Sequence, residues 1–268
     1  MRPKFIHILL TAASCGLLYG HPRLQAQTTL PDLPAPVITG KLGIKNSGAL
    51  LALQAFIQTS GAATWRDLHA DGQMIDPAGN SEPFDLWLRG GGYARLDVTS
   101  SNGVSSTRLT PCSGSLLTDK GITLTLPPAT ACAGFFAFPR LWRDAIRSAQ
   151  ISLRDFGDVL VNGERLHRLS MEYTGSSGGL AYGRQTTATD LYIDESSHLL
   201  VYSVDALAFP NTHGLLLKRI TSYSSYKQYS GVSIPTSISQ MLDGQFQWNM
   251  QIQNVQVNIS PDSSYFRF

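Results

Sequence analysis

The last long stretch of the chain, Gln245–Ile259, alternates apolar and polar residues with a period of two. Its first half has apolar residues at Phe246, Trp248, Met250 and Ile252, and its second half continues one position later at Val255, Val257 and Ile259. Successive side chains of a strand point to opposite faces, so an extra residue near Gln253-Asn254, a β-bulge, would keep one face apolar. At ~3.4 Å per residue this strand is ~50 Å long and must coil or belong to a large curved sheet.

The turn before this strand, at Asp243-Gly244, is compatible with two registers. A two-residue loop leaves Trp248 on the face of Ser237 and Ser239. A three-residue loop from Leu242 to Gly244 gathers the apolar residues of both strands on one face, by pairing Gln240 with Phe246, Ile238 with Trp248, Thr236 with Met250 and Ile234 with Ile252. We predict the three-residue loop, with Gly244 in the left-handed conformation that such loops need.

The first 26 residues have the features of a secretory signal. Arg2 and Lys4 precede an apolar run that ends in the small-residue exit Leu24-Gln25-Ala26, which predicts cleavage after Ala26. Two alternatives stay open, a retained membrane anchor and lipidation at Cys15. Residues 27–45 are rich in proline and predict a tether, and residues 46–268 predict a single domain. We therefore expect an exported protein of the periplasm or outer cell envelope, with no transmembrane span in the mature chain.

The charge balance limits the possible binding partners, and the cysteine content predicts a covalent link within the mature chain. Removal of residues 1–26 takes three basic residues and no acidic one, leaving 18 basic and 19 acidic side chains. This balance gives no basic surface for nucleic acid. Cys112 and Cys132 remain in the mature chain, and two cysteines in an oxidising compartment predict one disulfide, with two unpaired thiols as the alternative.

Turn-forming pairs such as Asn102-Gly103 and Asn162-Gly163 punctuate short runs of strand-forming residues, which is typical of an antiparallel meander. Strands are predicted at residues 67–75, 83–89, 93–99, 104–110, 115–118, 122–126, 151–153, 159–161, 164–173, 189–193, 199–206 and 218–228. An amphipathic helix is predicted to begin at Asn46 or Ser47 and to stop at Ser60-Gly61, as a plug of the core or a lid over the sheet. A second helix is predicted over residues 139–148.

Catalytic and metal-binding motifs are not found in the sequence. The mature histidines His69, His167, His198 and His213 form no HExxH or HxH motif, and GxSxG and phosphate-loop motifs are missing. Asp194-Glu195 fits a polar turn between two strands. The spacing of Tyr223, Tyr226 and Tyr229 leaves open which face of their strand points inward. We expect a protein that is not an enzyme and uses no cofactor or metal.

Several segments together resemble a known superfamily. The predicted helix followed by SGAATWRDLHADG, the strand pair FDLWLRGGGYARLDV and the ending VQVNISPDSSYFRF are similar to the periplasmic lipoprotein carriers of the LolA/LolB-like fold. CSGSLLTDKG and TDLYIDESSHLLVYSV resemble the hairpin and the acidic turn of that superfamily. The resemblance covers most of residues 46–268. It implies an incomplete antiparallel barrel lidded by helices, an interior that holds acyl chains, no cofactor, and a gate or lid contact at Arg95.

These observations predict a mainly β (α+β) fold, a single curved antiparallel sheet forming an incomplete barrel and covered by one or two helices. The first functional hypothesis is a carrier of a lipid or lipidated protein. Its acyl chains would lie on the apolar face lined by Ile234, Ile238, Phe246, Trp248, Met250 and Ile252. The second hypothesis is an envelope sensor or interaction domain, with a protein partner and a core filled by its own helices.

Overall fold

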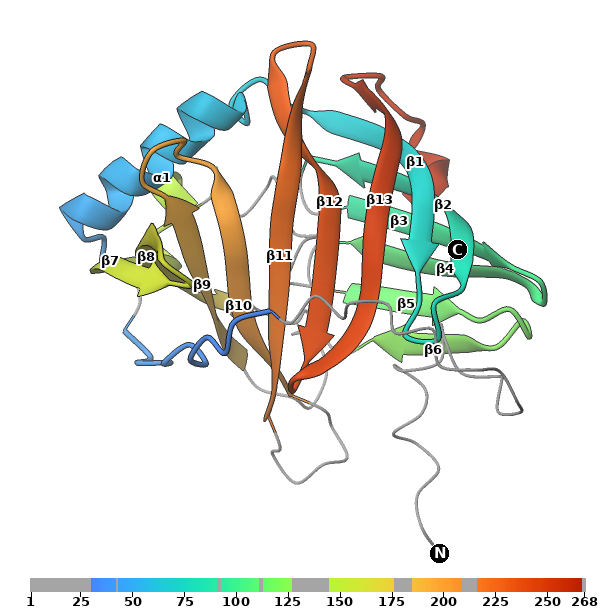
Figure 1. Ribbon diagram of the computed structural model, residues 1–268, viewed down its shortest axis with the longest axis horizontal. Helices are drawn as coiled ribbons and strands as arrows, with labels where there is room; N and C mark the ends of the chain where they lie inside the picture. The colour runs from blue at the N-terminus through green and yellow to red at the C-terminus, as the bar shows by residue number, and fades with distance from the viewer. Residues whose placement is uncertain are drawn as a thin grey trace, which may run out of the picture.

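A computed structural model describes residues 30–41, 43–90, 93–110, 113–126, 145–175, 185–208 and 216–266. Its strands form one thirteen-stranded antiparallel sheet, in the order β6-β5-β4-β3-β2-β1-β13-β12-β11-β10-β9-β8-β7 (Figure 1). The strands are β1 (Asp67–Ile75), β2 (Ser81–Arg89), β3 (Tyr93–Ser100), β4 (Gly103–Thr110), β5 (Ser113–Leu117), β6 (Thr123–Leu126), β7 (Ile151–Val161), β8 (Glu164–Gly175), β9 (Gln185–Asp194), β10 (Leu200–Ala208), β11 (Leu216–Tyr229), β12 (Val232–Leu242) and β13 (Gln245–Val257).

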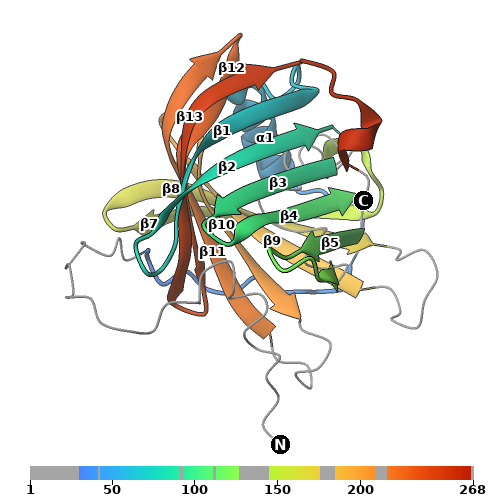
Figure 2. The ribbon, with the colours of Figure 1, turned by 90° about the vertical axis from the view of Figure 1, so that its right-hand side faces the viewer.

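The sheet is strongly curled and does not close on itself. β6 and β7 are its two edges and do not pair with each other, and Figure 2 shows the strands fanned around an open arc. Residues from both halves of the sheet pack into one apolar cluster, from Leu86 and Leu96 on one side to Leu169 and Leu191 on the other. Side chains from both ends can meet only on the concave face. The predicted incomplete barrel is confirmed.

Helix α1 (Ser47–Ser60) covers part of the concave face and contacts β7, β8 and β12. The Asn46 side chain caps its N-terminus by accepting a hydrogen bond from the Gly48 amide, and Gly61 ends it in the left-handed conformation, with φ 69°. Both boundaries agree with the sequence prediction. Of the predicted helix over residues 139–148, only residues 145–147 are described; they are helical, and Ala145 is buried in the concave cluster.

The β12–β13 turn corrects the predicted register. The structure has a two-residue loop, in which Asp243 and Gly244 both have positive φ (49° and 78°), as a type I′ turn requires. Leu242 pairs with Gln245 and Met241 with Phe246, but Gln240 pairs with Trp248. Gln247 is therefore an extra residue that forms a bulge, and this bulge places Ile238 and Met250 on one face. The expected left-handed Gly244 is confirmed; the three-residue loop is wrong.

The bulge predicted near Gln253-Asn254 is confirmed. Asn254 pairs with Asp71 of β1, while the next pair is Ile252 with Gly72, so Gln253 is the extra residue. A Cβ atom on Gly72 would lie 2.0 Å from the backbone oxygen of Gln251. The close approach of β1 and β13 at this bulge thus requires glycine.

Most of the other predicted strands recur with boundaries shifted by a few residues, but two of them are one strand. Residues 151–153 and 159–161 both belong to β7, which continues through Asp155, Phe156 and Gly157. Asp155 pairs with Leu169 and Gly157 with Arg168, so Phe156 is an extra residue. Gly157 takes the left-handed conformation, with φ 70°. This bulge breaks the alternation of the sequence, which explains why the pattern suggested two short strands.

Residues 30–41 and 43–45, which precede α1 and belong to the segment predicted as a tether, cross the convex face of β7–β11 (Figure 1). We call this segment the N-terminal belt. It has no helix or strand of its own beyond one bridge between Lys45 and Leu153. Leu33 of the belt is buried in a second apolar cluster, on the convex face, with Val161, Leu166, Tyr192, Val204 and Ile220.

Candidate functional site: the concave face

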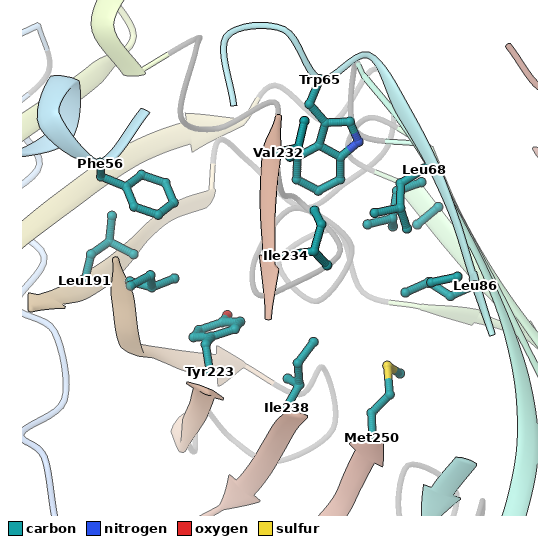
Figure 3. Packing of buried hydrophobic residues seen from close by; sticks show 14 of the residues in the cluster. Phe56, Trp65, Leu68, Leu86, Leu191, Tyr223, Val232, Ile234, Ile238 and Met250 are labelled. Carbon is teal, nitrogen blue, oxygen red and sulfur yellow. The ribbon is translucent and has the colours of Figure 1, made fainter. Parts of the chain in front are cut away.

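The concave face in front of β12 and β13 is the candidate site. Four of the predicted lining residues meet there in the apolar cluster, with exposed fractions between 0 and 6%: Ile234, Ile238, Met250 and Ile252 (Figure 3). Ile238 pairs directly with Met250, and Tyr223 pairs with Ile238 from the neighbouring strand. The sequence pattern therefore identified a contiguous apolar surface.

The two aromatic residues of β13, Phe246 and Trp248, lie on opposite faces of the sheet. Trp248 is half-buried and packs against the concave cluster. Phe246 pairs with Met241, whose neighbour Gln240 pairs with Trp248. Because neighbouring residues of a strand face opposite sides, the register places Phe246 on the convex face. The sequence did not reveal the bulge at Gln247, so Phe246 does not join the predicted lining.

Helix α1 closes this site from the other side. Ala49, Leu53 and Phe56 are fully buried in the concave cluster, and Figure 3 shows Phe56 pointing toward Leu191. Tyr226 and Tyr229 also pack against the cluster. The positive φ of Ser225, 56°, interrupts the alternation between Tyr223 and Tyr226. The three tyrosines thus contact the same cluster although their spacing mixes the two faces of an ideal strand.

One end of the concave face is polar. Asp205 of β10 and Arg219 of β11 pair directly across the sheet, and the Arg219 Nε donates to Asp205 Oδ1 at 2.8 Å while Nη2 donates to Oδ2. Their side chains are only 4% and 7% exposed. The next inward-facing pair, Ser203 and Thr221, is also buried. A bidentate ion pair flanked by hydroxyls therefore lies beside the apolar surface.

The hydroxyl of Tyr223 links the polar end to the apolar surface. It forms a 2.9 Å hydrogen bond with the hydroxyl of Ser203. Burial raises the pKa of Tyr223 well above its ordinary value, so the phenol stays neutral over the physiological range. Sequence reasoning missed this polar end because the apolar neighbours Val204 and Ile220 suggest the opposite orientation of both strands. Those neighbours face the convex cluster around Leu33.

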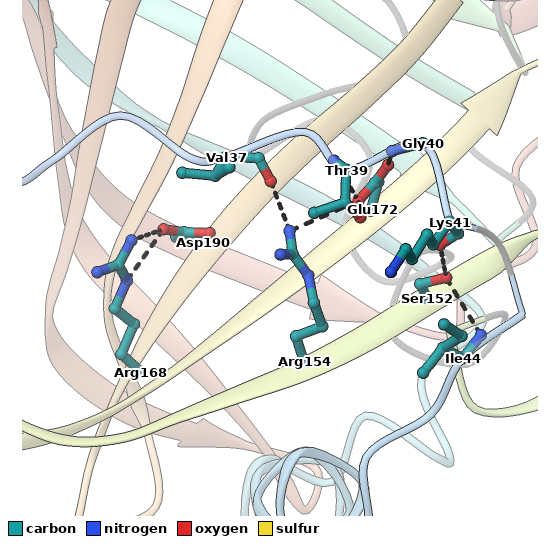
Figure 4. A network of polar contacts seen from close by, with 10 residues as sticks. All are labelled: Val37, Thr39, Gly40, Lys41, Ile44, Ser152, Arg154, Arg168, Glu172 and Asp190. Atoms are coloured by element: carbon teal, nitrogen blue, oxygen red, sulfur yellow. Dashed lines mark hydrogen bonds and ion pairs between the residues drawn. The ribbon is translucent and has the colours of Figure 1, made fainter.

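On the convex face, the belt is held by polar contacts (Figure 4). The carboxylate of Glu172, 0% exposed, accepts hydrogen bonds from the Thr39 amide at 3.0 Å, the Thr39 hydroxyl at 2.7 Å and the Gly40 amide at 2.5 Å. Arg154 donates to the carbonyl of Val37 at 2.5 Å. Burial alone would raise the pKa of Glu172, but the bonds from Thr39 and Gly40 and the charge of Arg154 outweigh it and lower that pKa.

Arg95 lies on the convex face of β3, away from α1. Its neighbours Ala94 and Leu96 occupy the concave cluster, and its Nε donates to Asp97 at 2.7 Å. The Tyr265 ring of the C-terminal 3₁₀ helix (Ser263–Phe266) is 5.9 Å from its guanidinium. Alternation along β3 thus turns Arg95 outward, and the expected gate or lid contact toward the interior is not supported.

Among the residues that the structure describes, which exclude His213, the other candidates from the sequence do not assemble into a catalytic or metal centre. His69 contacts Asp85 at 2.5 Å and His167 contacts Asp155 at 3.0 Å, on separate parts of the sheet. Within the described ranges no group of three or more histidine, cysteine or acidic side chains is arranged to bind a metal. Asp194 and Glu195 lie at the β9–β10 turn, as expected. Cys15, Cys112 and Cys132 fall outside the described residues.

Among the helices of the described residues, none combines the length and apolar character needed to cross a membrane.

Comparison with known proteins gives similarity only at the level of structure. No protein-family model and no curated protein matches the chain. A putative outer membrane lipoprotein-sorting protein domain from Vibrio parahaemolyticus superposes with a TM-score of 0.53 at 11% identity, over 82% of this chain and 97% of that one. The chain has the fold of this lipoprotein-sorting domain. The fold implied by the sequence resemblance is confirmed.

Two further solved structures are similar to this chain. A DUF1329 family protein from Desulfovibrio piger has a TM-score of 0.51 and 10% identity, over 82% of this chain and 98% of that one. A LolA superfamily protein from Nitrosomonas europaea has a TM-score of 0.49 and 12% identity, over 81% and 96%. At 10% identity the likeness to the Desulfovibrio piger protein concerns the fold alone.

Proposed function

We propose that this protein is an exported, non-enzymatic carrier that holds the acyl chains of a lipid or lipidated protein against its concave face. The observation that carries the proposal is the continuous apolar surface of Ile234, Ile238, Met250 and Ile252 inside an incompletely closed sheet. The fold shared with a lipoprotein-sorting domain supports it. Each buried methylene contributes about 0.8 kcal/mol, so alkyl chains need no polar recognition to bind there.

The face is closed by α1 in this structure, because Leu53 and Phe56 occupy the cluster. Ligand entry therefore requires these helix side chains to move away from β12. The helix is joined to β1 by the short turn of residues 61–64, and its C-terminal cap at Gly61 is a defined point about which it can swing.

The first experiment is secretion of the full chain from bacteria, followed by native and denaturing mass spectrometry. We expect a lipid-sized mass that is lost on denaturation. The denatured mass also tests cleavage after Ala26, lipidation at Cys15 and a disulfide between Cys112 and Cys132, because each changes the mass differently.

The second experiment uses two aromatic residues that lie two positions apart on opposite faces of the sheet. Trp248→Gln should lower the affinity for added palmitate at least about tenfold, because it removes apolar contact from the lining. Phe246→Gln, on the convex face, is the matched control and should bind as the wild type does. Equal affinity of wild type and a folded Trp248→Gln variant would reject the proposed face.

A second candidate function is a ligand-free envelope interaction domain. Burial of the proposed lining residues at 0 to 6% exposure favours it, since the helix already fills the face as a plug. It predicts a bare chain in the native spectrum and no uptake of added palmitate. In that case periplasmic crosslinking should recover a protein partner.

A further inference from the structure

The buried ion pair of Asp205 and Arg219 is the feature of the concave face that an acyl-chain site alone does not explain. The pair lies in one cross-strand row with Leu242, and the next row contains Ser203, Thr221 and Gln240. The row after that contains Tyr223 and Ile238, at the apolar surface. Alternate residues of a strand are ~6.8 Å apart, so the ion pair lies ~14 Å along the strands from Tyr223 and Ile238.

Stability does not account for this pair. Moving two charges out of water is costly, and apolar residues of similar volume often serve a folded core equally well or better. Arg219 and Asp205 are 7% and 4% exposed, so both have lost most of their hydration. A buried charged pair beside an apolar site is instead suited to orienting a polar group of a ligand.

The geometry leaves hydrogen-bond donors of Arg219 unused. A guanidinium carries five N–H groups in a rigid fork. Asp205 accepts one from Nε and one from Nη2. The other three N–H groups have no acceptor within hydrogen-bonding distance among the described residues, and Nη1, which carries two of them, is not fully buried. A donor that keeps some access within a largely buried guanidinium can bond to an acceptor that a bound ligand supplies.

The charge of the pair selects the kind of acceptor. Asp205 neutralises Arg219, and a ligand carboxylate or phosphate approaching the guanidinium would also meet the Asp205 carboxylate. An uncharged acceptor avoids this repulsion. We propose that Arg219, held by Asp205, binds the neutral carbonyl oxygen of an ester or amide that links an acyl chain to its head group. This inference rests on the proposed carrier function and names the chemical class of its ligand.

The test compares three probes with twelve-carbon chains, namely methyl laurate, laurate and dodecane, by displacement of fluorescent 1-aminoanthracene from the full-length protein. Wild type should bind methyl laurate at least about tenfold more tightly than dodecane or laurate, equivalent to about 1.4 kcal/mol. The double variant Asp205→Leu/Arg219→Met should lose this preference. Arg219→Lys keeps the ion pair but loses the planar guanidinium, so it should weaken the preference for methyl laurate. This variant keeps the test decisive if the double variant does not fold.

Each other result overturns the inference in a distinct way. A preference for methyl laurate that survives in both variants would show that Arg219 does not bind the carbonyl, while the carrier function would stand. A wild-type preference for laurate would show that the site selects an anion. Failure of folded wild type to bind any of the three probes would overturn the carrier function and the carbonyl site together.

Discussion

At the scale of single residues, Gly72 shows how closely the neighbouring strands β1 and β13 approach each other. Its hypothetical Cβ atom would lie 2.0 Å from the backbone oxygen of Gln251, and backbone atoms cannot swing aside as a flexible side chain can. We expect Gly72→Ala to lower the free energy of unfolding by about 3 kcal/mol, since overpacking forces β1 and β13 apart. Urea denaturation followed by circular dichroism measures this change.

Gly163→Ala is the matched control for Gly72. Gly163 has a positive φ of 86° in the β7–β8 turn, but nothing lies within 4 Å of its hypothetical Cβ atom. This variant should lower the free energy of unfolding by only about 1 kcal/mol, which is the conformational cost of an alanine in the left-handed region. Equal losses at the two positions would show that the close approach at Gly72 is not structurally important.

Glu172 should stabilise the protein by holding the belt. Glu172→Gln removes the charge that accepts bonds from Thr39 and Gly40, and we expect a loss of about 2 kcal/mol in unfolding free energy. Glu195→Gln is the control, because Glu195 is exposed and forms only a 3.5 Å ion pair with Arg165. It should change stability by less than about 0.5 kcal/mol.

The lowered pKa of Glu172 gives this contribution a pH dependence with a defined sign. A carboxyl whose pKa is lower in the folded than in the unfolded state stabilises the fold at pH above the unfolded value and loses this effect as pH falls. The difference in unfolding free energy between wild type and Glu172→Gln should therefore be full above the ordinary glutamate pKa of 4.5 and shrink below it. A difference that grows with acidity would contradict this assignment.

At the scale of elements, α1 should contribute to the global stability of the core. Leu53 is 0% exposed and Leu51, two residues earlier, is 67% exposed. Leu53→Ala should lower the free energy of unfolding by about 3 kcal/mol, whereas Leu51→Ala should change it by less than about 0.5 kcal/mol. Thermal unfolding followed by circular dichroism compares the two. Equal effects would indicate that α1 does not pack as the structure shows.

Local signals in the sequence were sufficient for α1 and for most strands. Asn46 and Gly61 cap the helix where the sequence predicts, and the glycine-containing turns separate the strands of the meander. The β12–β13 register was not predictable in the same way, because a longer loop and a bulge at Gln247 have the same effect on the alternation beyond Trp248. They differ in which residues pair, since Ile238 pairs with Met250 and not with Trp248, and in the face of Phe246, which the bulge turns to the other side.

At the scale of the whole molecule, the belt should be an integral part of the domain. Its residue Leu33 is buried among side chains from β7 to β11. A variant that begins at residue 43 would expose this cluster and leave Glu172 and Arg154 without their belt partners. We expect it to lose at least about 3 kcal/mol in unfolding free energy relative to a variant that begins at residue 27. Equal denaturation midpoints would show that the belt is only a tether.

The belt also explains what the sequence did not reveal about the site. A proline-rich segment without periodicity gives no sign that it will pack on a sheet, and the apolar residues of β10 then suggest the wrong inward face. Once Leu33 covers Val204, Asp205 must point into the concavity. The apolar lining was predictable because it follows from alternation within β13. The polar end depends on a contact between distant parts of the chain, which local patterns do not encode.

Among the described strands, the pairing of β1 with β13 is the one contact in the sheet that does not join neighbours in sequence. Local hairpins can assemble the strands β1–β6 and, separately, the strands β7–β13. The pairing of β1 with β13, for example of Leu68 with Val257, can form only after β13 has been synthesised. During synthesis, β1 therefore has an open edge until β13 has left the ribosome. An exposed strand edge can pair with other chains and cause aggregation. We therefore expect the nascent protein to depend on a holding chaperone until β13 has been synthesised.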